Sequence, residues 1–278
     1  MAALTTAPDA PTTSAPQRNA ARDTTDASGM QVLALRWGAV LFLLVVWEVV
    51  VDAFAKHNSF FASPSAVVVH GLSVFKDSGV TTALATTAER FGLAFLITTG
   101  FGVPIGLVLG RMTHIAPIAR NVAAVLYSVP QVAFYPLFIV WFGLGPRAEI
   151  AFGVSHGLIP VVLGTIAAAG TVDPELLEAS SAMGGGRISQ QLKVVLPSCL
   201  PQIVGALRLG AGLSLLGVLL AELLVSVDGV GGIMNQLSGT LQPARLDALL
   251  LSVSLAAVLI NLVVGRVERG LSRSRGTV

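Results

Sequence analysis

The chain has 278 residues, of which 54% are hydrophobic and only 12% are charged, and its mean hydropathy is +0.79. Soluble domains carry roughly 25% charged residues, so this composition excludes an ordinary soluble enzyme. The net charge of +2 is too small to indicate nucleic acid as a partner. One cysteine excludes an intrachain disulfide, and four scattered histidines predict no metal site. We therefore expect an all-α polytopic membrane protein whose surroundings are the lipid bilayer.

The first 29 residues differ from the rest. They are rich in Thr, Ala, Pro and Ser and contain no apolar run, so residues 1–29 are predicted to form a disordered tail. The first apolar stretch begins beyond residue 31 and is expected to be a retained span, because the tail lacks the apolar core of a cleaved signal. Residues 30–278 are then one transmembrane domain.

Six stretches are long and apolar enough to cross a bilayer as helices, which takes about 20 residues each. In chain order they are 37–54, 91–109, a stretch within 121–146, 150–169, 203–224 and 248–265. Arg208 and Glu222 lie toward the two ends of the fifth stretch, so their charged groups are expected at the membrane interface. The sequence predicts six transmembrane helices.

Two prolines interrupt the third stretch and predict a kinked or broken helix. Irregular backbone survives in a membrane only where protein buries it or where it lines a cavity. Ser128, Pro130, Gln131, Tyr135 and Pro136 are therefore candidates for a translocation path, with a simple kink as the alternative. 

Small residues recur at helical spacing in the second stretch, at Gly102, Gly106 and Gly110. Glycines four residues apart let helix backbones approach closely in lipid. Close packing between helices of this chain is the expected role. The glycines of the fifth stretch permit a subunit interface as well.

The basic residues give an orientation. With six spans, both termini share a side with the loops after the second and fourth spans, and that side holds twelve of the 17 Lys and Arg residues. Because basic loops stay in the cytoplasm, both termini are predicted to be cytoplasmic.

The loop between the fourth and fifth spans, residues 172–198, is unusually long. Asp173 is a good N-cap, Pro174 suits the first helical position, and the three glycines from Gly184 predict a sharp reversal after one short helix. A second short helix is expected over 188–195, ending before Leu196 and Pro197. The loop should therefore be a compact pair of helices outside the membrane.

Within this loop the sequence resembles the permease subunits of ABC importers. Their cytoplasmic signature is matched by Glu178-Ala179-Ser180, then Gly184, then Val194-Val195-Leu196-Pro197 at the same spacing, with Ser180 and Val194 as departures. Phe61–Val67, Pro130–Leu137 and Val172–Ala179 are similar to the branch that imports nitrate, sulfonates and taurine. The resemblance covers roughly residues 35–270 and implies a type I ABC importer permease fold.

The resemblance also implies partners and a role for the loop. It would be a coupling helix that docks on a separate ATPase, and the residues that match or flank the signature are Glu178, Ala179, Ser180, Met183, Gly184, Leu196 and Pro197. The implied complex is an importer of a small solute in a bacterial-type plasma membrane. It would contain two ATPase copies, a second permease copy in a homodimer and an extracytoplasmic substrate-binding protein.

Nucleotide chemistry is not expected in this chain. A phosphate-binding P-loop needs a lysine directly after glycine, and none of Lys56, Lys76 and Lys193 follows one. The chain is thus expected to be non-catalytic and to need no cofactor of its own, with ATP used by the partner. The alternatives are an ion-coupled secondary transporter, for which the second to fourth spans lack acidic residues, and an intramembrane enzyme, for which only His156 is available.

Overall fold

The computed structural model describes residues 29–54, 61–112, 114–226 and 228–273. The predicted disordered tail therefore lies outside the described residues, apart from Gly29. The chain divides into two units, Met1–Val50 and Val51–Val278. In the first unit the described residues belong to one helix, α1 (Gly29–Phe54), whose end continues into the second unit.

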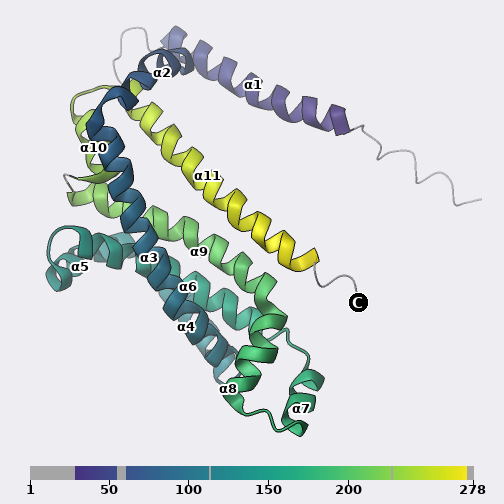
Figure 1. Cartoon of the computed structure of the whole chain (residues 1–278). Coiled ribbons are helices and arrows are strands. Elements are labelled where there is room, and N and C mark those ends of the chain that lie inside the picture. Colours follow the sequence, from purple (N-terminus) through teal and green to yellow (C-terminus); the bar gives the residue numbers. More distant parts are fainter. Residues whose placement is uncertain (1–28, 55–60, 113, 227, 274–278) are drawn as a thin grey trace, which may run out of the picture. The chain divides into compact units, whose positions relative to one another are not determined.

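The second unit is built from helices alone over its described residues, which confirms the all-α prediction (Figure 1). After α1 the helices are, in order, α2 (Pro64–Gly71), η1 (Leu72–Lys76), α3 (Ser78–Gly110), α4 (Ile115–Ser128), η2 (Gln131–Phe134), α5 (Tyr135–Phe142), α6 (Pro146–Ala169), α7 (Pro174–Ala182), α8 (Arg187–Gln190), η3 (Gln191–Val195), α9 (Leu196–Val225), α10 (Gly229–Gly239) and α11 (Pro243–Arg273).

Five helical segments among the described residues are long and apolar enough to cross a membrane: Ala34–Ala53, Ser78–Gly110, Pro146–Ala169, Arg187–Val225 and Pro243–Gly270. A sixth span exists if α4 and the η2–α5 segment count as one, and the two halves of this pair are bent by 78°. Each of the six predicted stretches falls in one of these segments. The predicted break in the third span is confirmed.

One predicted boundary is wrong by several turns. We expected the second span to begin after Arg90, yet α3 begins at Ser78. The predicted span was limited by Arg90 because an isolated charge is costly in a membrane. In the structure Arg90 is buried and ion-paired, so the helix continues through it.

The centre of the second unit consists of α3, α6 and α9, and glycines bring their backbones together. An added Cβ at Gly102 would lie 2.8 Å from Val161 Cγ1, and one at Gly110 would lie 2.8 Å from Ala169 Cβ. Gly106, between them, faces Thr165 in the same way. These glycines of α3 therefore pack against α6, which confirms their predicted role within this chain.

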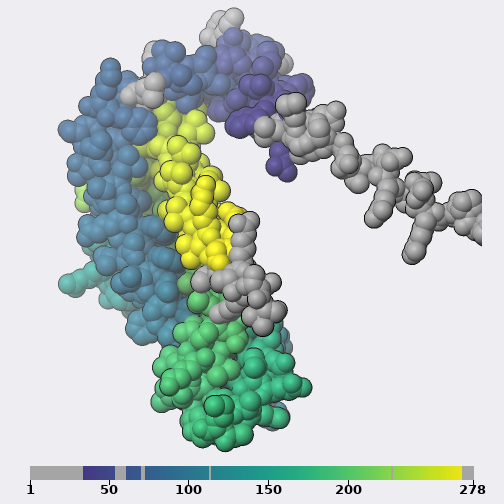
Figure 2. Space-filling view, turned by 45° about the vertical axis from the view of Figure 1, so that its right-hand side comes forward, coloured from purple at the N-terminus to yellow at the C-terminus, as the bar shows by residue number. Residues whose placement is uncertain are grey.

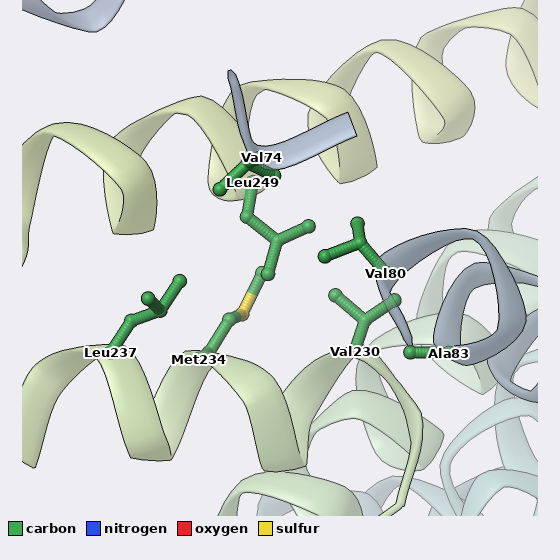
Figure 3. Packing of buried hydrophobic residues seen from close by; sticks show 7 residues of the cluster. All are labelled: Val74, Val80, Ala83, Val230, Met234, Leu237 and Leu249. Carbon is green, nitrogen blue, oxygen red and sulfur yellow. The ribbon is translucent and has the colours of Figure 1, made fainter. Parts of the chain in front are cut away.

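A second packed cluster holds α10 in place. Figure 3 shows Val230, Met234 and Leu237 of α10 beneath Leu249 of α11, with Val74, Val80 and Ala83 closing the cluster from η1 and α3. Apolar residues at i, i+4 and i+7 give α10 one buried face. This short helix is consequently fixed against both α3 and α11.

The start of α9 corrects a further prediction. We expected a break before Leu196 and Pro197, but α8, η3 and α9 run on as one helical segment from Arg187 to Val225. Pro197 lies in the first turn of α9, directly after the π-helical turn Gln191–Val195. The wider π turn continues the helix where a proline in a regular helix would clash with the preceding turn.

Candidate coupling loop and translocation path

The long loop lies at the end of the central helices where α3 and α6 finish and α9 begins. Leu107, Ala168, Ala169, Val172, Val195, Cys199 and Ile203 form a buried cluster at this end. Leu177 of α7 is partly buried against that cluster. Figure 2 shows this region, in green, at the projecting lower end of the second unit. The loop is thus attached to the helix core through Leu177.

The start of α7 follows the predicted capping. Asp173 Oδ1 accepts a hydrogen bond of 2.9 Å from the backbone N–H of Glu175, and Pro174 opens the helix. The acidic side chain in the first turn also complements the helix dipole.

The end of α7 follows the prediction as well. The backbone N–H groups of Gly184 and Gly185 donate to the carbonyls of Ser181 and Ser180, each at 2.9 Å. Gly184 has a φ of +77°, a conformation that glycine adopts without strain. The glycine run therefore reverses the chain as expected.

A side chain that the sequence did not single out ties the two short helices together. Gln190 Nε2 donates to Ser181 Oγ at 2.7 Å, to the Gly185 carbonyl at 3.3 Å and to the Leu177 carbonyl at 3.4 Å. An amide reaching three acceptors across the reversal limits relative motion of α7 and α8. The loop is accordingly a rigid projection.

Four apolar side chains of this projection are exposed. Leu176, Met183, Ile188 and Leu192 are 49%, 88%, 77% and 59% exposed. Glu178 and Ala179 are also exposed, as is Gly184. An uncovered apolar face next to small residues is typical of a protein-docking surface.

Three of the predicted loop residues are less accessible. Ser180 is half-buried, and a Cβ on Gly185 would lie 2.6 Å from its Oγ. Leu196 and Pro197 are half-buried at the start of α9, where Leu196 packs against the buried cluster. In this structure these three residues therefore support the shape of the loop, and the other predicted residues form its surface.

The candidate path residues lie along the bend of the broken third span. Ser128 ends α4, where its hydroxyl donates to the Val125 carbonyl at 2.7 Å, and Pro130 precedes η2. Ser128, Pro130 and Pro136 are exposed. Gln131 Oε1 is buried and has no hydrogen-bond partner within the described part of the chain.

Tyr135 is placed differently. It is only 2% exposed, and its ring centroid lies 4.9 Å from that of Phe152. Both rings belong to a cluster completed by Ala148 and Ala221. The Tyr135 side chain thus packs the bend against α6 and α9, and it faces no open surface of this chain.

A buried ion cluster that the sequence did not predict lies near the start of α6. Arg90 Nη1 is 2.6 Å from Glu149 Oε2 and 3.1 Å from Glu222 Oε1. The three residues are 4%, 1% and 0% exposed. The sequence predicted a charged group of Glu222 at the membrane interface; in the structure this carboxylate is enclosed by protein, and a guanidinium from α3 compensates its charge.

The same cluster anchors α10. Thr87 Oγ1 donates to Glu222 Oε2 at 2.9 Å and accepts from the Val230 N–H at 2.9 Å, while the Gly231 N–H donates to Glu222 Oε2 at 3.0 Å. Gly229 has a φ of +77°, and its position leaves no room for a Cβ beside the Glu222 carboxylate.

The sequence did contain one signal for this ion cluster: Arg90, Glu149 and Glu222 all fall near the predicted outer ends of their spans. Within the described residues no group of His, Cys, Asp and Glu is arranged to hold a metal ion.

The sequence of the chain is similar to those of known proteins. The chain is similar to the taurine transport system permease protein TauC of Escherichia coli, with 26% identity over 251 residues that cover 88% of this chain and 91% of TauC. It is 21% identical over 219 residues to the nitrate import permease protein NrtB of Leptolyngbya laminosa, covering 79% of this chain and 73% of NrtB.

A solved structure supports the fold. A chain of the MetNI methionine ABC transporter in an inward-facing conformation matches with a TM-score of 0.55 and 21% identity, covering 76% of this chain and 99% of that chain. The profile of the family described as "Binding-protein-dependent transport system inner membrane component" matches residues 102–276, which include the loop, most of the central helices and the ion cluster residues of α6 and α9. The chain is therefore a member of the family of inner-membrane components of binding-protein-dependent transport systems.

Proposed function

We propose that this chain is the permease subunit of an ATP-driven importer for a small solute that carries an oxyanion group, such as a sulfonate or nitrate. The family membership supports the permease role. The similarity to a taurine permease and a nitrate permease supports the cargo class. An extracytoplasmic binding protein would deliver the cargo to this subunit.

The observation that carries the proposal is the rigid, apolar projection formed by α7 and α8. A knob that Gln190 ties together internally and that Leu177 attaches to the core transmits a displacement of its surface to α6 and α9. In the proposed complex, the exposed face around Ala179 and Met183 docks on an ATPase subunit, which hydrolyses ATP. This chain would contribute no nucleotide chemistry and no cofactor.

The proposed assembly contains two copies of this chain and two ATPase subunits, with the loop and both termini in the cytoplasm. The excess of basic residues on the loop's side of the six spans supports this orientation. The cargo would pass along the broken third span, where Ser128, Pro130, Gln131 and Pro136 interrupt the helix and Tyr135 packs behind them.

The test is a substitution on the exposed loop face. Ala179→Arg places a charge at a close-packed contact, and desolvating an unpaired charge there is expected to cost several kcal/mol of binding free energy. The variant should lose ATPase pull-down and cargo uptake while its amount in the membrane stays normal. Ala179→Ser is the matched control, because it keeps the residue small, and it should behave like the parent.

Normal ATPase binding and uptake by Ala179→Arg would overturn the docking role of this face. Uptake that persists without any ATPase and follows an ion gradient would instead favour the secondary transporter.

A further inference from the structure

A groove between α9 and α11 combines a polar end with an apolar end. Its volume is about 440 Å³, and its lining includes Gly205, Arg208, Gly212, Leu213, Asn261 and Glu268. Figure 1 shows the C-terminal half of α11 approaching α9 in this region. Gly212 is exposed, and a Cβ added there would meet no atom within 4 Å. The glycine therefore leaves the groove wall open.

The polar end carries a net positive charge. Arg208 Nε donates to the Asn261 side-chain carbonyl, and Arg208 Nη1 lies 3.6 Å from Glu268 Oε2. A Cβ at Gly265 would lie 3.3 Å from Arg208 Nη1 and 3.8 Å from Arg269 Nη1, so both guanidinium groups lie beside Gly265 of α11. Among the described residues, these two guanidinium groups and one carboxylate sum to a net charge of +1.

This charge is accessible. The side chains of Arg208 and Glu268 are 42% and 32% exposed. A partly exposed charge within a membrane-spanning segment is costly when it faces hydrocarbon, so these groups require either water or an anion beside them.

The depth of the polar end indicates which anion it meets. At roughly 1.5 Å per residue, Arg208 lies about 25 Å along α9 from Val225, and Asn261 lies about 27 Å along α11 from Pro243. A hydrocarbon core of about 30 Å places both near the far interface, at the level of lipid headgroups. From Arg208 the groove continues toward the membrane centre past Gly212 and Leu213, which is the direction of an acyl chain.

We propose that this groove binds one anionic phospholipid of the cytoplasmic leaflet, with its phosphodiester on Arg208 and Arg269 and an acyl chain along Gly212. The proposal rests on the orientation given under the proposed function. Charge complementarity favours a lipid with a net charge of −1, such as phosphatidylglycerol. Basic pockets between transmembrane helices on the cytoplasmic side bind anionic lipid headgroups in general. Guanidinium groups also form paired hydrogen bonds with phosphate oxygens. A small soluble anion would make no use of the apolar wall.

The experiment measures lipid binding by the purified full-length chain in a non-ionic detergent, from the thermal unfolding midpoint as phosphatidylglycerol is added. We expect a saturable rise for the parent and a response at least tenfold weaker, in lipid concentration, for Arg208→Gln and for Arg269→Gln. Arg120→Gln is the matched control, since Arg120 is an exposed arginine of α4, a helix that forms neither wall of the groove, and it should respond like the parent.

A second variant leaves every charge in place. Gly212→Leu fills the groove wall at a position with open space around its Cβ, so the chain should fold normally and still lose the lipid response. This variant decides the question if Arg208→Gln proves unstable.

Three outcomes would overturn the proposal: a parent-like response from Gly212→Leu, an equal response of the parent to phosphatidylcholine, or displacement of the lipid by millimolar taurine or nitrate. The last outcome would assign the groove to cargo. ATPase pull-down by the same parent preparation is a separate readout. Its failure would contradict the importer role and leave the lipid measurement standing.

Discussion

Arg90 is the residue on which the charge balance of the helix core depends, because it is shared by two buried carboxylates. Removing one partner of a buried ion pair leaves an uncompensated charge, which costs about 3–5 kcal/mol. Arg90→Met is therefore expected to destabilise the fold by about this amount. Glu149→Gln should cost much less, because it leaves one guanidinium facing one carboxylate.

Unfolding of the purified chain by denaturant in detergent would compare the two variants. Glu89→Gln is the control, since Glu89 is the exposed neighbour of Arg90 on α3, and it should leave stability unchanged. If Glu149→Gln were as damaging as Arg90→Met, the cluster would depend on both carboxylates equally, and the charge argument would be wrong.

Gly184 gives a prediction for the loop. Its φ of +77° is strained for a β-branched residue, so Gly184→Val should cost about 1–3 kcal/mol at the reversal after α7. We expect reduced ATPase pull-down and uptake at a normal membrane level. Gly186→Ala tests the same glycine run without strain, because Gly186 has a φ of −69° and no atom within 4 Å of an added Cβ. Equal loss from both substitutions would mean that the positive φ is not the cause.

At the scale of helices, the contact between α3 and α6 depends on glycine. A Cβ at Gly106 would overlap the Thr165 side chain and approach the Val162 carbonyl at 3.0 Å. Gly106→Ala should therefore destabilise the chain by about 1–3 kcal/mol through overpacking. Gly100→Ala on the same helix has open space and should be neutral or slightly stabilising. Thermal unfolding of both variants in detergent would measure the difference, and equal midpoints would contradict close packing at Gly106.

The sequence predicted those helical features that depend on interactions between residues close together in the chain. Apolar length locates the spans, and local hydrogen bonds fix Asp173 and Gly184 as the ends of α7, so these were predictable. The early start of α3 was not, because Arg90 is tolerated only through carboxylates more than 50 residues away. The continuous helix through Pro197 depends on a π turn that composition does not indicate.

The candidate site likewise contains features that the sequence could predict and features that depend on distant contacts. The exposed loop face was predictable from the spacing of Leu176, Ala179 and Met183 on one helix. The inward position of Tyr135 was not, since it results from packing on Phe152 of α6. The amide of Gln190 was missed for a similar reason, because only the reversal after α7 brings its three acceptors within reach.

At the scale of the whole molecule, the remaining question is which side of the membrane carries the loop. Helix α3 begins next to Lys76 of η1, and one span later it ends on the side of the loop, because Leu107 packs in the cluster that holds Leu177. Lys76 and Arg187 must therefore lie on opposite sides of the membrane if α3 crosses it once. The basic excess on the loop side predicts that Arg187 is cytoplasmic.

Compartment-specific reporters fused after Lys76 and after Arg187 test this arrangement in cells. We expect an extracytoplasmic signal from the first fusion and a cytoplasmic signal from the second, and a reporter at the C-terminus should agree with the second because two further spans, in α9 and α11, separate them. Reversed signals would keep the fold and place the loop outside, where no ATPase could reach it. Signals from one compartment at both Lys76 and Arg187 would contradict a single crossing by α3 together with the packing of Leu107 beside the loop.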